Sequence, residues 1–219
     1  MARCQKQDTK KELLEAGMKI MLEKGYTSSG LQQVLDAVGV PKGSFYHYFE
    51  SKEDFALEII QHYDLAYTES VLSCLRDQSL TPLQRLRKFC MTNKEKLELW
   101  SCTNGCLIGN LSQEMASQSE RLREKLEEVF VRWRDLFAAA IAEGQAAGEI
   151  DPRFEALELA DLFLSGWEGA VMRSKSTRSS ISIDNFVKLM FVFLAGARQF
   201  ETSQEARPVD FAARPLPHV

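Results

Sequence analysis

The stretch Gly25–Phe55, GYTSSGLQQVLDAVGVPKGSFYHYFESKEDF, decides how the first part of this chain folds. It opens with a pattern typical of an amphipathic helix, which stops at Gly39. The apolar positions of that helix are spaced for one face: Leu31, Val34, Leu35 and Val38. Ser29 is the expected N-cap, and Pro41 suits the start of a second helix because its missing N–H costs nothing there. Two short helices joined by Gly-Val-Pro predict a helix-turn-helix.

The outer face of the second helix is small, polar and aromatic. Its members are Lys42, Gly43, Ser44, Tyr46 and His47. In a helix-turn-helix the second helix enters the major groove of DNA. The small residues then allow close approach, and the polar ones face phosphates and bases, while Phe45 and Phe49 point inward. The alternative is that these are surface residues of a short helical hairpin without DNA.

The same stretch resembles the DNA-binding signature of the TetR family of bacterial transcriptional repressors. The shared elements are Gly-aromatic, a small hydroxyl residue, a Gly-Val turn, Lys-Gly, Tyr-x-x-Phe and Ser-Lys, in the family's order and spacing. The resemblance implies phosphate contacts at Ser29 and Lys52 and a recognition helix from Lys42 to His47. Pro41 departs from the pattern, because many relatives carry Ser or Thr there. The resemblance also implies a homodimer that binds a palindromic operator in double-stranded DNA.

The whole chain is less informative than this motif. It has 219 residues, a hydrophobic fraction of 45% and a net charge of −4, so any nucleic-acid binding surface must be local. We expect no signal peptide and no membrane span, which predicts a cytoplasmic protein. The basic arm that contains Arg3 and Lys6 is either a further DNA contact or a solvated terminus.

Helical periodicity runs through nearly the whole chain, and no period-two run indicates a strand. We therefore predict an all-α fold with a helix-turn-helix domain over residues 1–50 and a larger helical effector-binding and dimerisation domain over 51–200. Residues 201–219, with three prolines, are expected to be a flexible tail. The predicted helices span residues 9–24, 29–39, 41–49, 51–75, 81–100, 106–117, 120–147, 154–175 and 184–200.

In this family the last two long helices of each subunit form a four-helix dimer interface. The matching segments here are Phe154–Lys175 and Asn185–Phe200, which combine large apolar residues with small ones such as Gly166 and Gly196. Some of these positions must face the subunit's own core, and periodicity does not separate the two sets.

Two further segments, Gly105–Met115 and Trp167–Lys175, resemble a subgroup of TetR repressors that includes NemR and AcuR. That resemblance implies an inducer that is a reactive electrophile or an acrylate-like unsaturated acid, with Cys106 as sensor thiol or pocket residue. Independently, Cys106 follows a glycine at the start of a predicted helix, whose N-terminus favours a thiolate. Lys175 is the cation that the subgroup match places nearby. The alternative is that Cys106 is a small buried hydrophobic residue.

Other effector-site candidates are less specific. Trp133, Trp167 and Glu168 line a pocket or belong to the core, and Asn110 with Gln113 would supply polar pocket groups. Cys102 is a resolving thiol or an incidental loop cysteine.

The Cys and His spacing predicts no metal site, and we expect no cofactor and no catalytic residues. The leading hypothesis is a repressor that a small-molecule inducer releases from DNA, rather than an enzyme. The alternatives are an unrelated non-covalent inducer, a transcriptional activator, a helical interaction protein that has lost DNA binding, and a thiol-dependent enzyme.

Overall fold

The computed structural model describes residues 2–196, with side chains from residue 8 onward, and this part of the chain is all helical. The helices, in order, are α1 Ala2–Lys24, α2 Leu31–Val38, α3 Lys42–Phe45, α4 Lys52–Leu75, α5 Pro82–Leu99, α6 Leu107–Met115, α7 Glu120–Ala146, α8 Ala156–Thr177 and α9 Ile181–Ala195. The predicted all-α fold is confirmed. The tail at 201–219 and the side chains of Arg3 and Lys6 lie outside what the structure describes.

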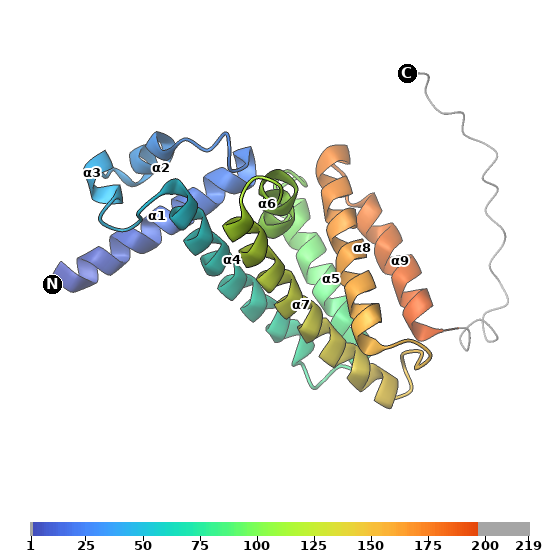
Figure 1. The fold of residues 1–219 in the computed structure, drawn as a ribbon. Coiled ribbons are helices and arrows are strands. Elements are labelled where there is room, and N and C mark those ends of the chain that lie inside the picture. The colour runs from blue at the N-terminus through green and yellow to red at the C-terminus, as the bar shows by residue number, and fades with distance from the viewer. Residues whose placement is uncertain (1, 197–219) are drawn as a thin grey trace, which may run out of the picture.

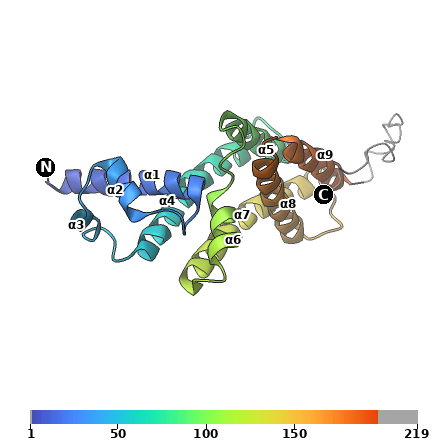
Figure 2. The ribbon, with the colours of Figure 1, turned by 90° about the horizontal axis from the view of Figure 1, so that it is seen from above.

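The N-terminal helices and the C-terminal helix pair lie at opposite ends of the molecule (Figures 1 and 2). Helices α1 to α3 form one end, and α4 runs from them into the body beside α7. Helix α7 packs against α4, α5, α6 and α8, so it is the central helix of the body. Helices α8 and α9 pack together at the other end (Figure 1). None of the described helices is long and apolar enough to cross a membrane.

An aromatic cluster holds α3 against α4. The rings of Phe45, Phe49 and Phe55 have centroids 4.7–5.2 Å apart, and all three side chains are buried. Gly17 brings α1 close to α4, because a Cβ there would collide with Phe55. Phe45 and Phe49 thus point inward, as predicted, and the first turns of α4 belong to the packing of the N-terminal helices.

The helix boundaries follow local capping chemistry with two corrections. Ser51 caps α4 by accepting from the Asp54 N–H at 3.0 Å, and Thr81 with Gln84 forms a capping box at α5. The prediction that Ser29 caps α2 is wrong: Gly30 precedes α2, and the Ser29 hydroxyl donates to the Tyr26 carbonyl at 2.7 Å. Helix α1 also begins at Ala2, seven residues before the predicted start at Thr9.

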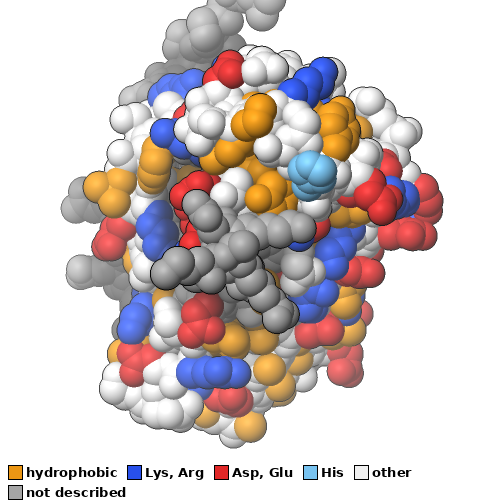
Figure 3. All heavy atoms as spheres, turned by 90° about the vertical axis from the view of Figure 1, so that its left-hand side faces the viewer, with side chains coloured by type: hydrophobic (Ala, Val, Ile, Leu, Met, Phe, Trp, Pro, Cys, Tyr) orange, Lys and Arg blue, Asp and Glu red, His pale blue; other side chains and the backbone are white. Residues whose placement is uncertain are grey.

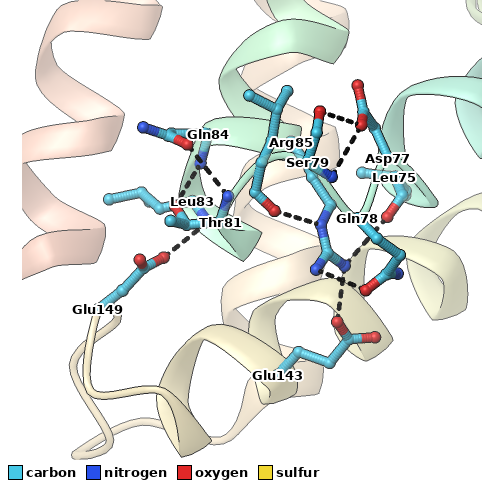
Figure 4. A network of polar contacts seen from close by, with 11 residues as sticks. Leu75, Asp77, Gln78, Ser79, Thr81, Leu83, Gln84, Arg85, Glu143 and Glu149 are labelled. Atoms are coloured by element: carbon cyan, nitrogen blue, oxygen red, sulfur yellow. Dashed lines mark hydrogen bonds and ion pairs between the residues drawn. The ribbon is translucent and has the colours of Figure 1, made fainter.

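A buried arginine joins helices at the end of the body distant from the helix-turn-helix. Arg85 is 6% exposed and donates to the carbonyls of Leu75 and Leu80 and to the Glu143 carboxylate (Figure 4). The loop between α4 and α5 therefore closes around a cation that is tied to α7. Glu149 adds a second link by accepting from the Leu83 N–H at 3.1 Å.

Candidate functional site

The helix-turn-helix presents most of its predicted recognition residues to solvent. Lys42, Gly43, Tyr46 and His47 are exposed, and Ser44 is half-buried. The turn before α3 is made by Gly39, whose φ of 73° lies in the left-handed region that glycine adopts without strain. Helix α3 is a single turn, Lys42–Phe45, so Tyr46 and His47 lie on the turn that follows it rather than on a longer recognition helix.

The two predicted phosphate ligands have partners inside the protein. Ser29 is buried, and its hydroxyl is engaged with Tyr26. Lys52 donates to the Tyr26 carbonyl at 2.7 Å, and its Nζ lies 4.5 Å from the centre of the Tyr26 ring. Burial lowers the pKa of Lys52, and the Glu114 carboxylate acts in the opposite direction without cancelling the effect. Both residues shape the turn between α1 and α2.

The described surface at this end of the molecule is mixed in charge. Figure 3 shows basic and acidic side chains interspersed, with hydrophobic side chains and a histidine gathered in its upper part. With a net charge of −4, a small DNA-contacting surface at the helix-turn-helix is more consistent with the sequence than a broad basic face.

A cavity of about 600 Å³ lies within the body, next to the N-terminal helices. Its walls come from α1, α4, α5 and α8 and from the loop before α6. Apolar and aromatic side chains dominate, and His62, Lys19 and Lys96 add nitrogen donors. Concave, mostly apolar sites with a few polar groups are typical of small-molecule pockets. Tyr63, Tyr67, Cys106 and Trp167 are among the side chains that line it.

Cys106 is the N-cap residue of α6 and lines this cavity, but its thiol is shielded. Burial raises the pKa of the Cys106 thiol well above its ordinary value, and the Glu168 carboxylate raises it further. Hydrogen bonds from the Gly109 and Ile108 backbone and from Tyr63 act in the opposite direction and are too weak to reverse the shift. The predicted thiolate is therefore corrected: at neutral pH the resting thiol keeps its proton, because loss of water outweighs the helix N-terminus.

The Glu168 carboxylate on α8 lies close to Cys106, on the other side of Gly109. A Cβ at Gly109 would collide with the Glu168 carboxylate, so glycine lets α8 approach the first turn of α6. Burial raises the pKa of Glu168 to about 7, and a hydrogen bond with Cys106 acts in the opposite direction. Its Oε1 atom is sealed from solvent and has no hydrogen-bond partner in the part of the chain that the structure describes.

Three of the predicted effector residues lie away from the cavity wall. Trp133 is fully buried beneath Tyr67, and its indole N–H donates to Asp64 at 2.8 Å. Asn110 donates to the Asn104 carbonyl and, with Lys175, lines a different surface depression. The Lys175 stem lies against Gly105, beside Cys106 in the chain, but its charge does not set the pKa of the Cys106 thiol. Trp167 and Cys106 do line the cavity.

Tyr63 and Tyr67 are cavity residues that the sequence did not single out. They are one turn apart on α4, their rings stack 5.8 Å apart, and the Tyr63 hydroxyl lies 3.9 Å from the Cys106 sulfur. Their spacing follows the helical period, a signal that many core residues share. Only the tertiary packing of α4 against α6 distinguishes them.

Helix α6 connects this cavity to the helix-turn-helix. Cys106 lies at its N-terminus, and Glu114 in its last turn accepts the backbone N–H groups of Tyr26 and Thr27, each at 2.7 Å. Arg121 at the start of α7 adds ion pairs to Glu53 and Asp54 in the first turn of α4. The DNA-binding end therefore contacts the body through the helix that carries the cavity cysteine.

The outer surface of α8 and α9 is apolar and grooved. The exposed large hydrophobic side chains of the two helices are Leu157, Leu162, Met172, Ile181, Leu189, Val192 and Phe193. A groove of about 650 Å³ runs between the helices, past Gly166 and Gly169. The structure thus separates the predicted interface residues: Phe163, Trp167 and Leu194 face the core, whereas Leu162 and Phe193 face outward.

An exposed helix-turn-helix joined by one helix to an internal cavity defines a DNA-binding regulator that responds to a small ligand. The comparisons agree. Residues 13–59 match the family model described as bacterial regulatory proteins, tetR family, and residues 82–190 match the one described as tetracyclin repressor-like, C-terminal domain. The chain belongs to the TetR family of transcriptional regulators.

Named relatives align over most of their length. The chain is 41% identical to the transcriptional regulator AcuR of Cereibacter sphaeroides over 163 residues, 74% of each chain. It is 36% identical to the transcriptional repressor DhaR of Mycobacterium sp. strain GP1, covering 83% of this chain and 90% of that one. It is 31% identical to the repressor NemR of Escherichia coli, covering 81% and 89%.

Solved structures show the same fold. A regulatory protein TetR from Rhodobacter sphaeroides superposes with a TM-score of 0.81 at 37% identity, covering 84% of this chain and 97% of that one. The reduced form of E. coli NemR superposes with a TM-score of 0.76 at 27% identity, covering 83% and 95%. The predicted placement in the NemR and AcuR subgroup is confirmed.

Proposed function

We propose that this TetR-family repressor binds a palindromic operator as a homodimer and leaves it when a small electrophile or unsaturated acid reacts with Cys106. One observation carries the proposal. Cys106 lies on the cavity wall and at the N-terminus of α6, whose last turn holds the DNA-binding end through Glu114. A change at the thiol can therefore be transmitted along one short helix.

The homodimer rests on the apolar face of α8 and α9. A row of large exposed hydrophobic side chains beside a groove is typical of an interface between proteins. Two copies related by a twofold axis would then present two helix-turn-helix motifs to successive turns of DNA, about 34–36 Å apart. Because its partner is DNA in a bacterial family, we expect the protein to act in the cytoplasm.

The cavity and its thiol support the proposed inducer class. The aromatic wall favours a planar, apolar portion, and the nitrogen donors of Lys19, His62 and Lys96 favour a carboxylate or carbonyl oxygen. An acrylate-like molecule combines both features with a carbon that a thiol can attack. The resemblance to NemR and AcuR supports the same class.

For the inducer to release DNA, it must favour the conformation of the repressor that does not bind DNA over the one that does. A bulky adduct on the buried Cys106 sulfur would displace its neighbours, among them the first turn of α6 against Glu168. Movement of α6 would then shift Glu114 and the turn at Tyr26 that it holds. The spacing of the two recognition helices would no longer match the operator.

A gel-shift assay on the DNA upstream of the protein's own gene tests the proposal, at fixed salt and with and without acrylate or N-ethylmaleimide. We expect both compounds to release the wild type and neither to release Cys106→Ser, with Cys90→Ser as a buried-thiol control on α5. Release of Cys106→Ser by acrylate would replace the covalent proposal with non-covalent binding in the same cavity. Failure to bind any DNA selected from random sequence would contradict the repressor itself.

A further inference from the structure

The protonated resting state of Cys106 leaves a chemical problem for a thiol sensor. A thiol adds to an activated alkene as the thiolate, so something must remove the proton. Cysteine sensors commonly rely on a cation or a helix N-terminus to hold the thiolate. Here burial opposes that form, and the Lys175 stem packs against Gly105 without setting the charge state of the sulfur.

The structure offers an acceptor on α8. A Cβ at Gly109 would meet both the Glu168 carboxylate and the Cys106 side chain, so glycine at this position brings the two groups together at the first turn of α6. The Oε1 atom of Glu168 is sealed from solvent and has no partner among the described residues, which is rare for a buried carboxyl oxygen. Tyr63 approaches the same sulfur from α4, on the cavity side.

We propose that Glu168 is the proton acceptor that activates Cys106, so that the pair Glu168–Cys106 forms the reactive site of this regulator. This inference rests on the proposed function and names the group that makes its thiol chemistry possible. Cys106 lines the cavity, whereas Glu168 is not among the cavity's lining residues and lines a separate depression between α7 and α8.

The step balances without any other reactant. The S–H bond breaks as its proton passes to the Glu168 carboxylate, and the sulfur electron pair forms a bond to the terminal carbon of an alkene conjugated with a carbonyl. The electrons of the C=C bond move to the carbonyl to give an enolate. The enolate carbon then takes the proton back from Glu168, so the product is the simple addition of S–H across the double bond.

The titration of Glu168 makes the proposal measurable. Burial raises the pKa of Glu168 to about 7, so the carboxyl group is protonated and inactive as a base below that pH and active above it. The other titratable or charged groups around it are Cys106, Tyr63 and Tyr67 on the cavity side, Glu127 and Arg134 on α7, and Asp161 on α8. Arg134, the cation among these groups, forms an ion pair with Asp135.

The test labels the intact protein with N-ethylmaleimide across a pH series. Peptide mass spectrometry after digestion then gives the rate of Cys106 alkylation at each pH. For the wild type we expect a rate that rises through about pH 7 and then levels off. For Glu168→Gln we expect a rate about 100-fold lower just above neutral pH, rising only as hydroxide ionises the thiol directly. Asp161→Asn, an exposed carboxylate on the same helix, should behave as wild type.

Each outcome decides between the alternatives. Equal rates and equal pH profiles in wild type and Glu168→Gln would overturn the proton-acceptor role and leave the thiol-sensor function standing. A faster reaction in Glu168→Gln would also overturn it, because the carboxylate would then only suppress the thiolate. No modification of Cys106 in either protein would overturn both proposals. Glu168→Asp keeps the titratable group, so it should keep a rise through neutral pH even if Glu168→Gln folds poorly.

Discussion

Glu114 on α6 accepts a hydrogen bond of 2.7 Å from the backbone N–H of Tyr26, in the turn after α1, and its second oxygen accepts from the Thr27 N–H at the same distance. Lys52 completes the arrangement by donating to the Tyr26 carbonyl. The turn that precedes α2 is therefore held by a carboxylate from the effector-binding body and a lysine from α4. This contact joins the helical body to the helix-turn-helix.

Glu114→Ala should destabilise the fold at neutral pH by about 1–2 kcal/mol, because the half-buried Tyr26 N–H and the Thr27 N–H lose a charged acceptor. Chemical denaturation measures this, with Glu127→Ala as an exposed acid control on α7. A loss no larger than that of the control would show that solvent replaces the carboxylate freely.

The same contact predicts a pH dependence. Burial raises the pKa of Glu114, but the hydrogen bonds from Thr27 and Tyr26 outweigh it, and the net shift is downward. A depressed carboxyl pKa contributes stability above its unfolded value, and this contribution is lost as the pH falls through the folded value. The difference in stability between wild type and Glu114→Ala should therefore shrink as the pH falls below about 4. A constant difference down to acid pH would contradict this.

Arg85→Met should cost about 2–3 kcal/mol of unfolding free energy, because the Leu75 and Leu80 carbonyls lose their buried donor. Glu143→Gln should cost less than about 1 kcal/mol, since the Glu143 side chain is 56% exposed and regains water. Denaturant unfolding of the two variants checks the asymmetry. Equal losses would mean that the ion pair, rather than carbonyl satisfaction, stabilises this end of the body.

Lys42→Ala should weaken operator binding and lower the salt slope of the affinity by about one unit, because the exposed ammonium at the start of α3 is expected to neutralise one phosphate. Lys88→Ala is the control, since Lys88 pairs with Asp77 beside the loop between α4 and α5, away from the helix-turn-helix. Fluorescence anisotropy over a salt series measures both. An unchanged salt slope for Lys42→Ala would show that Lys42 does not contact a DNA phosphate.

Leu189→Glu should convert the protein to a monomer and abolish operator binding, because a carboxylate would replace an apolar side chain at the proposed interface. Leu65→Glu is matched to it: the exposed fractions in the isolated chain are 65% for Leu189 and 63% for Leu65, which lies on α4. Analytical ultracentrifugation gives the mass of each variant. A dimeric Leu189→Glu protein would place the interface elsewhere.

Local patterns were enough to predict the fold class and the helix-turn-helix. The Gly39 turn, the inward Phe45 and Phe49, and the caps at Ser51 and Thr81 depend on residues only a few positions apart. Ser29 shows the limit of that reasoning, because its hydroxyl could either cap α2 or donate to the Tyr26 carbonyl, and local sequence favours both. The turn at Tyr26 is held by Glu114 and Lys52, which are distant in the sequence, and there the hydroxyl donates to the carbonyl.

The sequence by itself determined that the chain is helical, that it has a helix-turn-helix, and that Cys106 begins a helix in the body, because helix periodicity and capping act over short distances. Only the tertiary structure decided the rest. It placed Tyr63 beside Cys106, moved Trp133 into the core, and set Glu168 close to Cys106. The charge state of Cys106 depends on its burial away from water and on the carboxylate of Glu168, 62 positions later in the chain. The residues next to Cys106 in the sequence indicate neither effect.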